Sequence, residues 1–126
     1  MGHMKITGLL FWVQENHLSA KFYKKLGFDV IHEDDEHSAV ALHDLTITLV
    51  SMRDEDQFTL DAMAAEKGRG MYVYIRVTDV DETYRKLRAA GCQPVSEPRD
   101  WKWGNREFIV KDPDGYKLCF WHPLQP

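Results

Sequence analysis

The fold is decided by the stretch WKWGNREFIVKDPDGYKLCFW, residues 101–121, whose middle predicts a β-hairpin. Residues 107–111 are predicted to form an apolar strand, and residues 117–121 its return strand. The run Asp112-Pro113-Asp114-Gly115 between them is typical of a tight turn, because proline presets φ, aspartate bonds back to the backbone and glycine accepts positive φ. Two tryptophans, Trp101 and Trp103, precede the hairpin in an aperiodic segment, where such large rings either cap the core or bind a ligand.

Composition limits the class of protein. A chain of 126 residues, 44% of them hydrophobic, is long enough for one globular domain or two small fused modules. It contains no run of about eighteen apolar residues, so no membrane helix is expected. The net charge of −4 argues against a nucleic-acid binder and could favour a cationic ligand, although solubility alone also explains it.

The ends and the cysteines indicate a cytoplasmic protein. Residues 1–3 are interpreted as a cloning remnant, which leaves residues 4–126 as one domain, and no export signal follows. Cys92 and Cys119 lack metal-type spacing and are expected to be reduced thiols in the cytoplasm.

Outward from the hairpin, the chain reads as two similar halves. The first, about 4–52, has predicted strands at 5–13, 28–33, 38–43 and 45–51 and a helix at 17–26. A polar linker, about 53–70, holds one short helix around 60–66. The second half, about 71–123, has predicted strands at 71–77 and 92–95, a helix at 81–90, and the hairpin strands. Glu15, Asn16 and Asp79 are expected to cap the two longer helices, and Gly27 and Gly91 to end them.

The spacing supports an internal repeat, because Val13 precedes Gly27 by the same interval as Val77 precedes Gly91. Each half is therefore a βαβββ module, and the predicted fold class is α+β.

The run from Trp103 to Phe120, a Trp-Gly-x-Arg-Glu segment leading into a strand and an Asp-Pro-x-Gly turn, resembles one large superfamily. This is the glyoxalase / bleomycin resistance / extradiol dioxygenase (vicinal oxygen chelate) superfamily, and its bleomycin-resistance branch in particular. Residues 22–28, FYKKLGF, carry the likeness in the first half, so it covers essentially the whole chain. The resemblance implies two tandem βαβββ modules whose curved mixed sheets form a cleft with the helices outside, and it implies a homodimer.

Strand alternation predicts which side chains face that cleft. Apolar residues such as Phe11, Val13, Leu118 and Phe120 would pack under the helices. The predicted ligand-binding residues are the aromatic side chains of the opposite faces and of the loop, with one histidine: Trp12, His43, Tyr72, Tyr74, Trp101, Trp103 and Trp121. The alternative is that several of these rings only fill space between the sheets.

Enzymes of the resembled superfamily bind one divalent metal through His, Gln or Glu. The positions of this chain that match those ligands hold Gly8, Thr48, Tyr72 and Cys119, and a set of this composition does not bind such a metal. We therefore expect no metal, no cofactor and no catalytic residue, with His32 and His43 as the two histidines that could point inward.

Three functional hypotheses remain. The first is metal-free binding of an aromatic small molecule, which could be cationic, in the manner of antibiotic sequestration by bleomycin-resistance proteins. The second is a metal-dependent lyase, isomerase or dioxygenase with a relocated metal site. The third is a protein that uses its aromatic residues as a partner surface.

Overall fold

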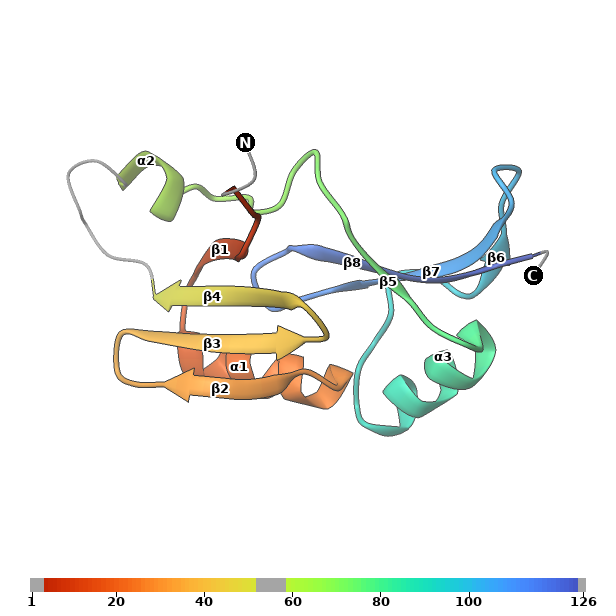
Figure 1. Cartoon of the computed structure of the whole chain (residues 1–126), viewed down its shortest axis with the longest axis horizontal. Helices are drawn as coiled ribbons and strands as arrows, with labels where there is room; N and C mark the ends of the chain where they lie inside the picture. The colour runs from red at the N-terminus through yellow and green to blue at the C-terminus, as the bar shows by residue number, and fades with distance from the viewer. Residues whose placement is uncertain (1–3, 52–58, 125–126) are drawn as a thin grey trace. The chain divides into compact units, whose positions relative to one another are not determined.

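The computed structural model describes residues 4–51 and 59–124 (Figure 1). The chain divides into two compact units, Met1–Ala65 and Glu66–Pro126. Unit 1 contains β1 (Gly8–Val13), α1 (Asn16–Leu26), β2 (Asp29–Glu33), β3 (His37–Leu42), β4 (Leu45–Ser51) and α2 (Thr59–Ala62). Unit 2 contains β5 (Val73–Arg76), α3 (Val80–Ala89), β6 (Arg99–Asp100), β7 (Asn105–Lys111) and β8 (Lys117–Pro123). The predicted α+β class with two βαβββ modules is confirmed.

The sheet of unit 1 has the strand order β1-β4-β3-β2, with β1 parallel to β4 and the other pairs antiparallel. Helix α1 packs against β2, β3 and β4 (Figure 1). The predicted alternation holds on β1, because Phe11 and Val13 are buried whereas Leu10 is exposed. Tyr23 of α1 and Ile47 of β4 are also fully buried, so the helix and one face of the sheet share a core.

The sheet of unit 2 has the matching order β5-β8-β7-β6, with β5 parallel to β8. Helix α3 packs against β7 and β8. In the core, Phe108 and Phe120 are cross-strand partners whose rings stack at 5.2 Å, and Tyr84 of α3 meets Phe108 edge-on. One face of this sheet is therefore covered by its own helix, as in unit 1.

Local turn and cap chemistry follows the prediction at three places. Oδ1 of Asp112 accepts hydrogen bonds from the backbone N–H groups of Asp114 and Tyr116, both at 2.9 Å, which closes the β7–β8 turn. Gly27 ends α1 with φ 108°, a conformation that glycine adopts without steric cost. Oδ1 of Asp79 accepts from the Glu82 N–H at 3.1 Å and caps α3.

Two strand predictions are wrong. No strand covers residues 92–95; the edge strand is β6, further along the chain, which pairs with β7. Strand β3 ends at Leu42, so His43 lies in the turn before β4 with φ 54° and not in the strand.

Three residues near strands and helix ends also differ from the prediction. Glu15 occupies the N-cap position of α1 but makes no side-chain cap bond. Asn16 is instead the first residue of the helix, and its buried side chain bonds to other parts of unit 1. His122 lies inside β8, where its Nδ1 accepts from the Val80 N–H at 2.9 Å, because β8 runs two residues further than predicted.

Candidate functional site

Unit 2 contains a pocket of about 360 Å³. Its walls come from the start of the unit and β5, from the loop that leads into β6, from the β6–β7 hairpin, and from β7 and β8. The lining residues are Tyr72, Tyr74, Ser96, Glu97, Arg99, Trp101, Trp103, Glu107, Phe108, Ile109 and Cys119. Glu107 and Ile109 alternate with the core residue Phe108 along β7, and Cys119 is the cross-strand partner of Ile109. The pocket therefore lies on the sheet face opposite the Phe108–Phe120 core.

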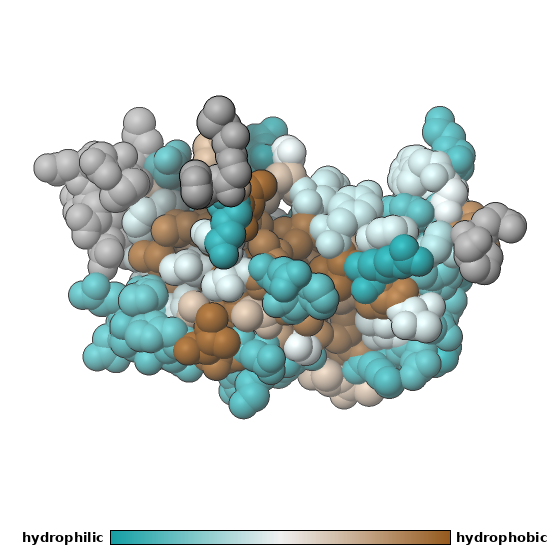
Figure 2. Space-filling model, in the orientation of Figure 1, coloured by the Kyte–Doolittle hydropathy of each residue, from teal (hydrophilic) through white to brown (hydrophobic). Residues whose placement is uncertain are grey.

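Exposed aromatic side chains mark this pocket on the surface. Tyr72, Tyr74 and Trp103 are 49%, 53% and 54% exposed, which is high for rings of this size. On the hydropathy scale of Figure 2 tyrosine and tryptophan lie near the white middle, so these exposed rings are not among the brown side chains of the face shown there. Exposed rings gathered at one concave place are a common property of ligand sites.

The two loop tryptophans form one stacked pair. The rings of Trp101 and Trp103 lie 4.6 Å apart at 9°, and the guanidinium carbon of Arg99 lies 3.8 Å from the Trp101 ring centre. Two stacked groups cannot share one face of an indole, so Trp101 is covered on both faces. Trp103 is the outer ring of the pair, and it is the one that can accept a flat ligand.

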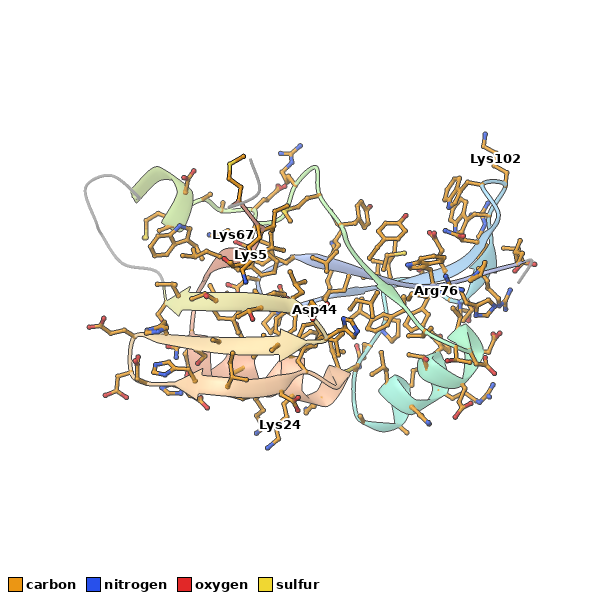
Figure 3. All side chains as sticks on the ribbon, viewed as in Figure 1. Lys5, Lys24, Asp44, Lys67, Arg76 and Lys102 are labelled. Carbon is orange, nitrogen blue, oxygen red and sulfur yellow. The ribbon has the colours of Figure 1, made fainter. Side chains whose placement is uncertain are left out.

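A tight turn produces this stacking. The Gly104 N–H donates to the Trp101 carbonyl at 3.0 Å, and the Trp101 N–H donates to the Asn105 carbonyl at 2.8 Å. Gly104 has φ 94°, which other residues rarely adopt, so the glycine allows the two indoles to meet. Figure 3 places Lys102 at the tip of this hairpin, with its side chain directed away from the sheet.

A buried carboxylate lies beside the tryptophan pair. Glu107 is only 4% exposed, and its Oε2 accepts from Trp103 Nε1 at 3.1 Å and from Asn105 Nδ2 at 3.0 Å. Tyr74 and Cys119 line the pocket beside this carboxylate and interact with it electrostatically. The donors offset the cost of burying the carboxylate among aromatic groups.

The same cluster keeps Tyr74 and Cys119 protonated. Although Tyr74 is 53% exposed, desolvation inside the pocket, followed by repulsion from Cys119 and Glu107, raises its pKa to about 12. Burial, followed by repulsion from Glu107, raises the pKa of the Cys119 thiol to about 12. At neutral pH both groups therefore carry their protons and can donate them in hydrogen bonds.

Arg106 points to the other face of β7, because neighbours in a strand alternate. Its Nε and Nη2 donate to the carboxylate of Asp81 at 2.9 and 3.0 Å, and its Nη1 donates to Asp100 at 2.8 Å. Arg106 therefore pairs with acidic side chains of α3 and β6 and not with its neighbour Glu107. These bonds hold the pKa of Asp81 below its usual value and join α3 to β7.

Four of the seven predicted site residues, Tyr72, Tyr74, Trp101 and Trp103, line this one pocket. Trp121 does not line it; its ring lies 6.5 Å from Tyr74 and 5.3 Å from the Arg76 guanidinium carbon.

The other two predicted residues belong to unit 1. Trp12 is half-buried on β1. The side chain of His43 is 88% exposed, with Nδ1 3.3 Å from Oδ2 of Asp44, which Figure 3 shows at the β3–β4 turn. A ligand-binding role for Trp12 and His43 remains a prediction.

Sequence reasoning missed the role of Glu107 and the contribution of Arg99. The available signal for Glu107 was an acidic residue directly before the apolar run 108–110 in a strand. Such a residue is either at a strand end or buried with partners, and β7 continues two residues before it.

The four positions matched to family metal ligands do not fit a divalent ion. At Gly8, an added Cβ would lie 2.4 Å from the Thr46 carbonyl oxygen, so β4 blocks any side chain there. Thr48 lies opposite Leu10 on β1 and offers one neutral hydroxyl. In unit 2, the partner of Cys119 on β5 is Tyr74, and the protonated thiol is a poor ligand. These positions supply neither imidazole nor carboxylate.

Two βαβββ units, each with a parallel pair of strands and a helix on one sheet face, define the class of paired βαβββ proteins. A family model described as Glyoxalase/Bleomycin resistance protein/Dioxygenase superfamily matches residues 5–120, and the chain belongs to that superfamily.

Relatives agree with this assignment. A bleomycin resistance protein from Geobacillus stearothermophilus is 26% identical over 116 residues, covering 85% of this chain and 88% of the relative. A crystal structure of a glyoxalase/bleomycin resistance protein/dioxygenase from Nocardioides is similar in fold, with TM-score 0.79, 23% identity and coverage of 98% and 85% of the two chains. A bleomycin-binding protein complexed with bleomycin has TM-score 0.66, 21% identity and coverage of 94% and 98%. Among the described residues, no helix is long and apolar enough to cross a membrane.

Proposed function

We propose that this protein binds an aromatic small molecule that carries positive charge, without a metal, and sequesters it as bleomycin-resistance proteins do. One observation carries the proposal: the half-exposed ring of Trp103 is hydrogen-bonded through Nε1 to the buried carboxylate of Glu107. A flat group stacked on Trp103 therefore lies close to a fixed negative charge.

The pocket offers each part of such a ligand a matching surface. Trp103 supplies a ring face, Tyr72 and Tyr74 supply further aromatic walls, and Ile109 contributes an aliphatic one. Glu107 and Glu97 are the carboxylates of the lining, so a positive group is favoured over a negative one. Arg99 also lines the pocket, with its guanidinium over Trp101, and its positive charge offsets part of this preference.

Relatives with established binding support the antibiotic class. A protein of the same fold is described as a bleomycin-binding protein complexed with bleomycin. Bleomycin is therefore the first compound to test.

Titration with metal-free bleomycin, followed by tryptophan fluorescence and repeated with excess chelator, tests the proposal. We expect saturable quenching that chelator does not change. No response at high drug concentration would reject bleomycin as the ligand. A response abolished by chelator would instead favour the metal-dependent enzyme hypothesis, and metal analysis of the purified protein would follow.

The proposal includes a homodimer and a cytoplasmic location. The family resemblance supports the dimer, and the reduced buried thiols Cys92 and Cys119 agree with the cytoplasm. Size-exclusion chromatography with light scattering measures the first, and cell fractionation measures the second.

A further inference from the structure

A separate group of polar side chains converges on the β2–β3 hairpin of unit 1. Nε2 of His32 lies 2.8 Å from Oδ2 of Asp34, and Nδ1 of His37 lies 3.5 Å from the same oxygen. The two imidazole rings stack at 4.6 Å and 23°. One ligand atom from each of the three residues lies within 4.8 Å of the other two.

We infer that His32, Asp34 and His37 form a binding site for a divalent transition-metal ion of the Zn²⁺ type. Zinc bonds of about 2.0–2.2 Å place two neighbouring ligand atoms about 3–3.5 Å apart. The two distances to Oδ2, 2.8 and 3.5 Å, are close to this range, and all three ligand atoms lie within 4.8 Å of one another, so rotation of the side chains can bring them onto one ion. Two imidazoles and one carboxylate suit Zn²⁺, Co²⁺ or Ni²⁺, whereas Ca²⁺ and Mg²⁺ prefer oxygen ligands.

The carboxylate is already oriented for this role. Oδ1 of Asp34 accepts from the backbone N–H groups of Glu36 at 2.8 Å and His37 at 2.9 Å. The second oxygen, Oδ2, is the one that faces both imidazoles. Such anchoring of a ligand by surrounding hydrogen bonds raises metal affinity.

The backbone of the hairpin is fixed from beneath. The Asp34 N–H donates to the His37 carbonyl at 2.9 Å, which closes the turn. Nδ2 of buried Asn16 donates to the Asp34 carbonyl and to Ser38 Oγ, both at 2.9 Å, and Ser51 Oγ donates to Asn16 Oδ1. These hydrogen bonds therefore hold in place the backbone that carries the three ligand residues.

The surroundings favour a cation. Glu33, Asp35 and Glu36 follow or precede Asp34 in the chain and add negative charge. His17 is held by Glu33, with Nδ1 2.6 Å from Oε2, and its Nε2 lies 3.9 Å from Asp35. The trio belongs to none of the four positions matched to family ligands, so this inference is independent of the pocket of unit 2.

Isothermal titration of the chelator-stripped full chain with Zn²⁺ tests the site. We expect His32→Asn and His37→Asn each to weaken binding by more than about 10-fold, since even outer-shell partners are worth about 10–100-fold. Asp34→Asn retains the Oδ1 acceptor of the turn but loses the charge, and it should weaken binding similarly. Excess Mg²⁺ should not compete.

Two variants serve as matched controls. His43→Asn removes an exposed histidine that also lies beside an aspartate, Asp44, but belongs to no such three-residue group among the described residues. His3→Gln removes a histidine that lies outside the described residues. Each control should leave the Zn²⁺ affinity within about twofold of the parent, and circular dichroism confirms that all variants fold.

Long-range ¹H–¹⁵N spectra of the imidazole rings identify the coordinating atoms directly. Zn²⁺ should shift Nε2 of His32 and Nδ1 of His37, the atoms that face Asp34. The inference is overturned if these nitrogens do not respond to Zn²⁺, or if His32→Asn and His37→Asn bind it as the parent does.

Discussion

Trp103→Ala should weaken binding of an aromatic ligand by about 2 kcal/mol. A fully covered tryptophan buries about 150–250 Å². Because 54% of Trp103 is exposed, a stacked ligand can cover about 100 Å² of it. At about 25 cal/mol per Å² this contact is worth about 2.5 kcal/mol, from which ordering of the ligand subtracts a part.

A loss of about 2 kcal/mol corresponds to about a 30-fold increase in Kd. Isothermal titration with metal-free bleomycin measures it without relying on the fluorescence that the substitution removes. Trp103→Phe is the control, since it keeps a stacking ring while losing the Nε1 bond to Glu107. We expect it to recover more than half of the lost free energy. A change below threefold for Trp103→Ala would refute stacking on this ring.

Three further predictions address the charge, the fold and the pH dependence. Glu107→Gln should weaken binding of a cationic aromatic ligand by about 30-fold in titration calorimetry, since unit charges about 8 Å apart interact by about 2 kcal/mol. It should leave binding of a neutral analogue unchanged. Gly8→Ala should destabilise unit 1 by about 1–3 kcal/mol in urea unfolding, because its Cβ would meet the Thr46 carbonyl; unchanged stability would contradict the steric block. Asp81→Asn should cost about 1 kcal/mol at pH 7. Because Arg106 lowers the pKa of Asp81, the ion pair stabilises the folded state above pH about 4 and loses this contribution on acidification. The unfolding free energies of variant and parent should therefore become equal at low pH.

The parts of the fold that local chemistry determines could be predicted from sequence. The β7–β8 turn depends on an aspartate, a proline and a glycine in adjacent positions, and its hydrogen bonds form within the turn. Strand β4 was predicted with its observed bounds because apolar residues alternate along it. Gly27 ends α1 and Asp79 caps α3 through hydrogen bonds to residues within one helical turn.

Pairing between strands from distant segments of the chain could not be predicted in this way. Strand β6 consists of Arg99 and Asp100, a polar pair without any strand pattern, and it exists because β7 pairs with it. The run 92–95 looked more like a strand but forms none. The strand predicted at 92–95 was wrong because it rested on strand propensity, whereas at the edge of a sheet pairing with the neighbouring strand decides which segment forms a strand.

The candidate site likewise has one part that could be predicted from sequence and one part that could not. The aromatic walls of the pocket followed from strand alternation and from two tryptophans in an aperiodic loop. The position of Glu107 beneath Trp103 required the turn at Gly104, the register of β7 with β8, and a rotamer choice. None of these is visible in composition or periodicity.

The hydrogen bonding of Glu107 also limits how a ligand can use its charge. One carboxylate oxygen already accepts from Trp103 and Asn105. A ligand that formed a direct ion pair would have to displace one of these donors, and a buried donor left without its partner costs about 1–3 kcal/mol. The carboxylate therefore acts through space, which favours a cation whose charge is spread over or near the stacked ring. A ligand with a compact ammonium group that must touch the carboxylate would gain less, because it would break the hydrogen bonds that hold Trp103 in place.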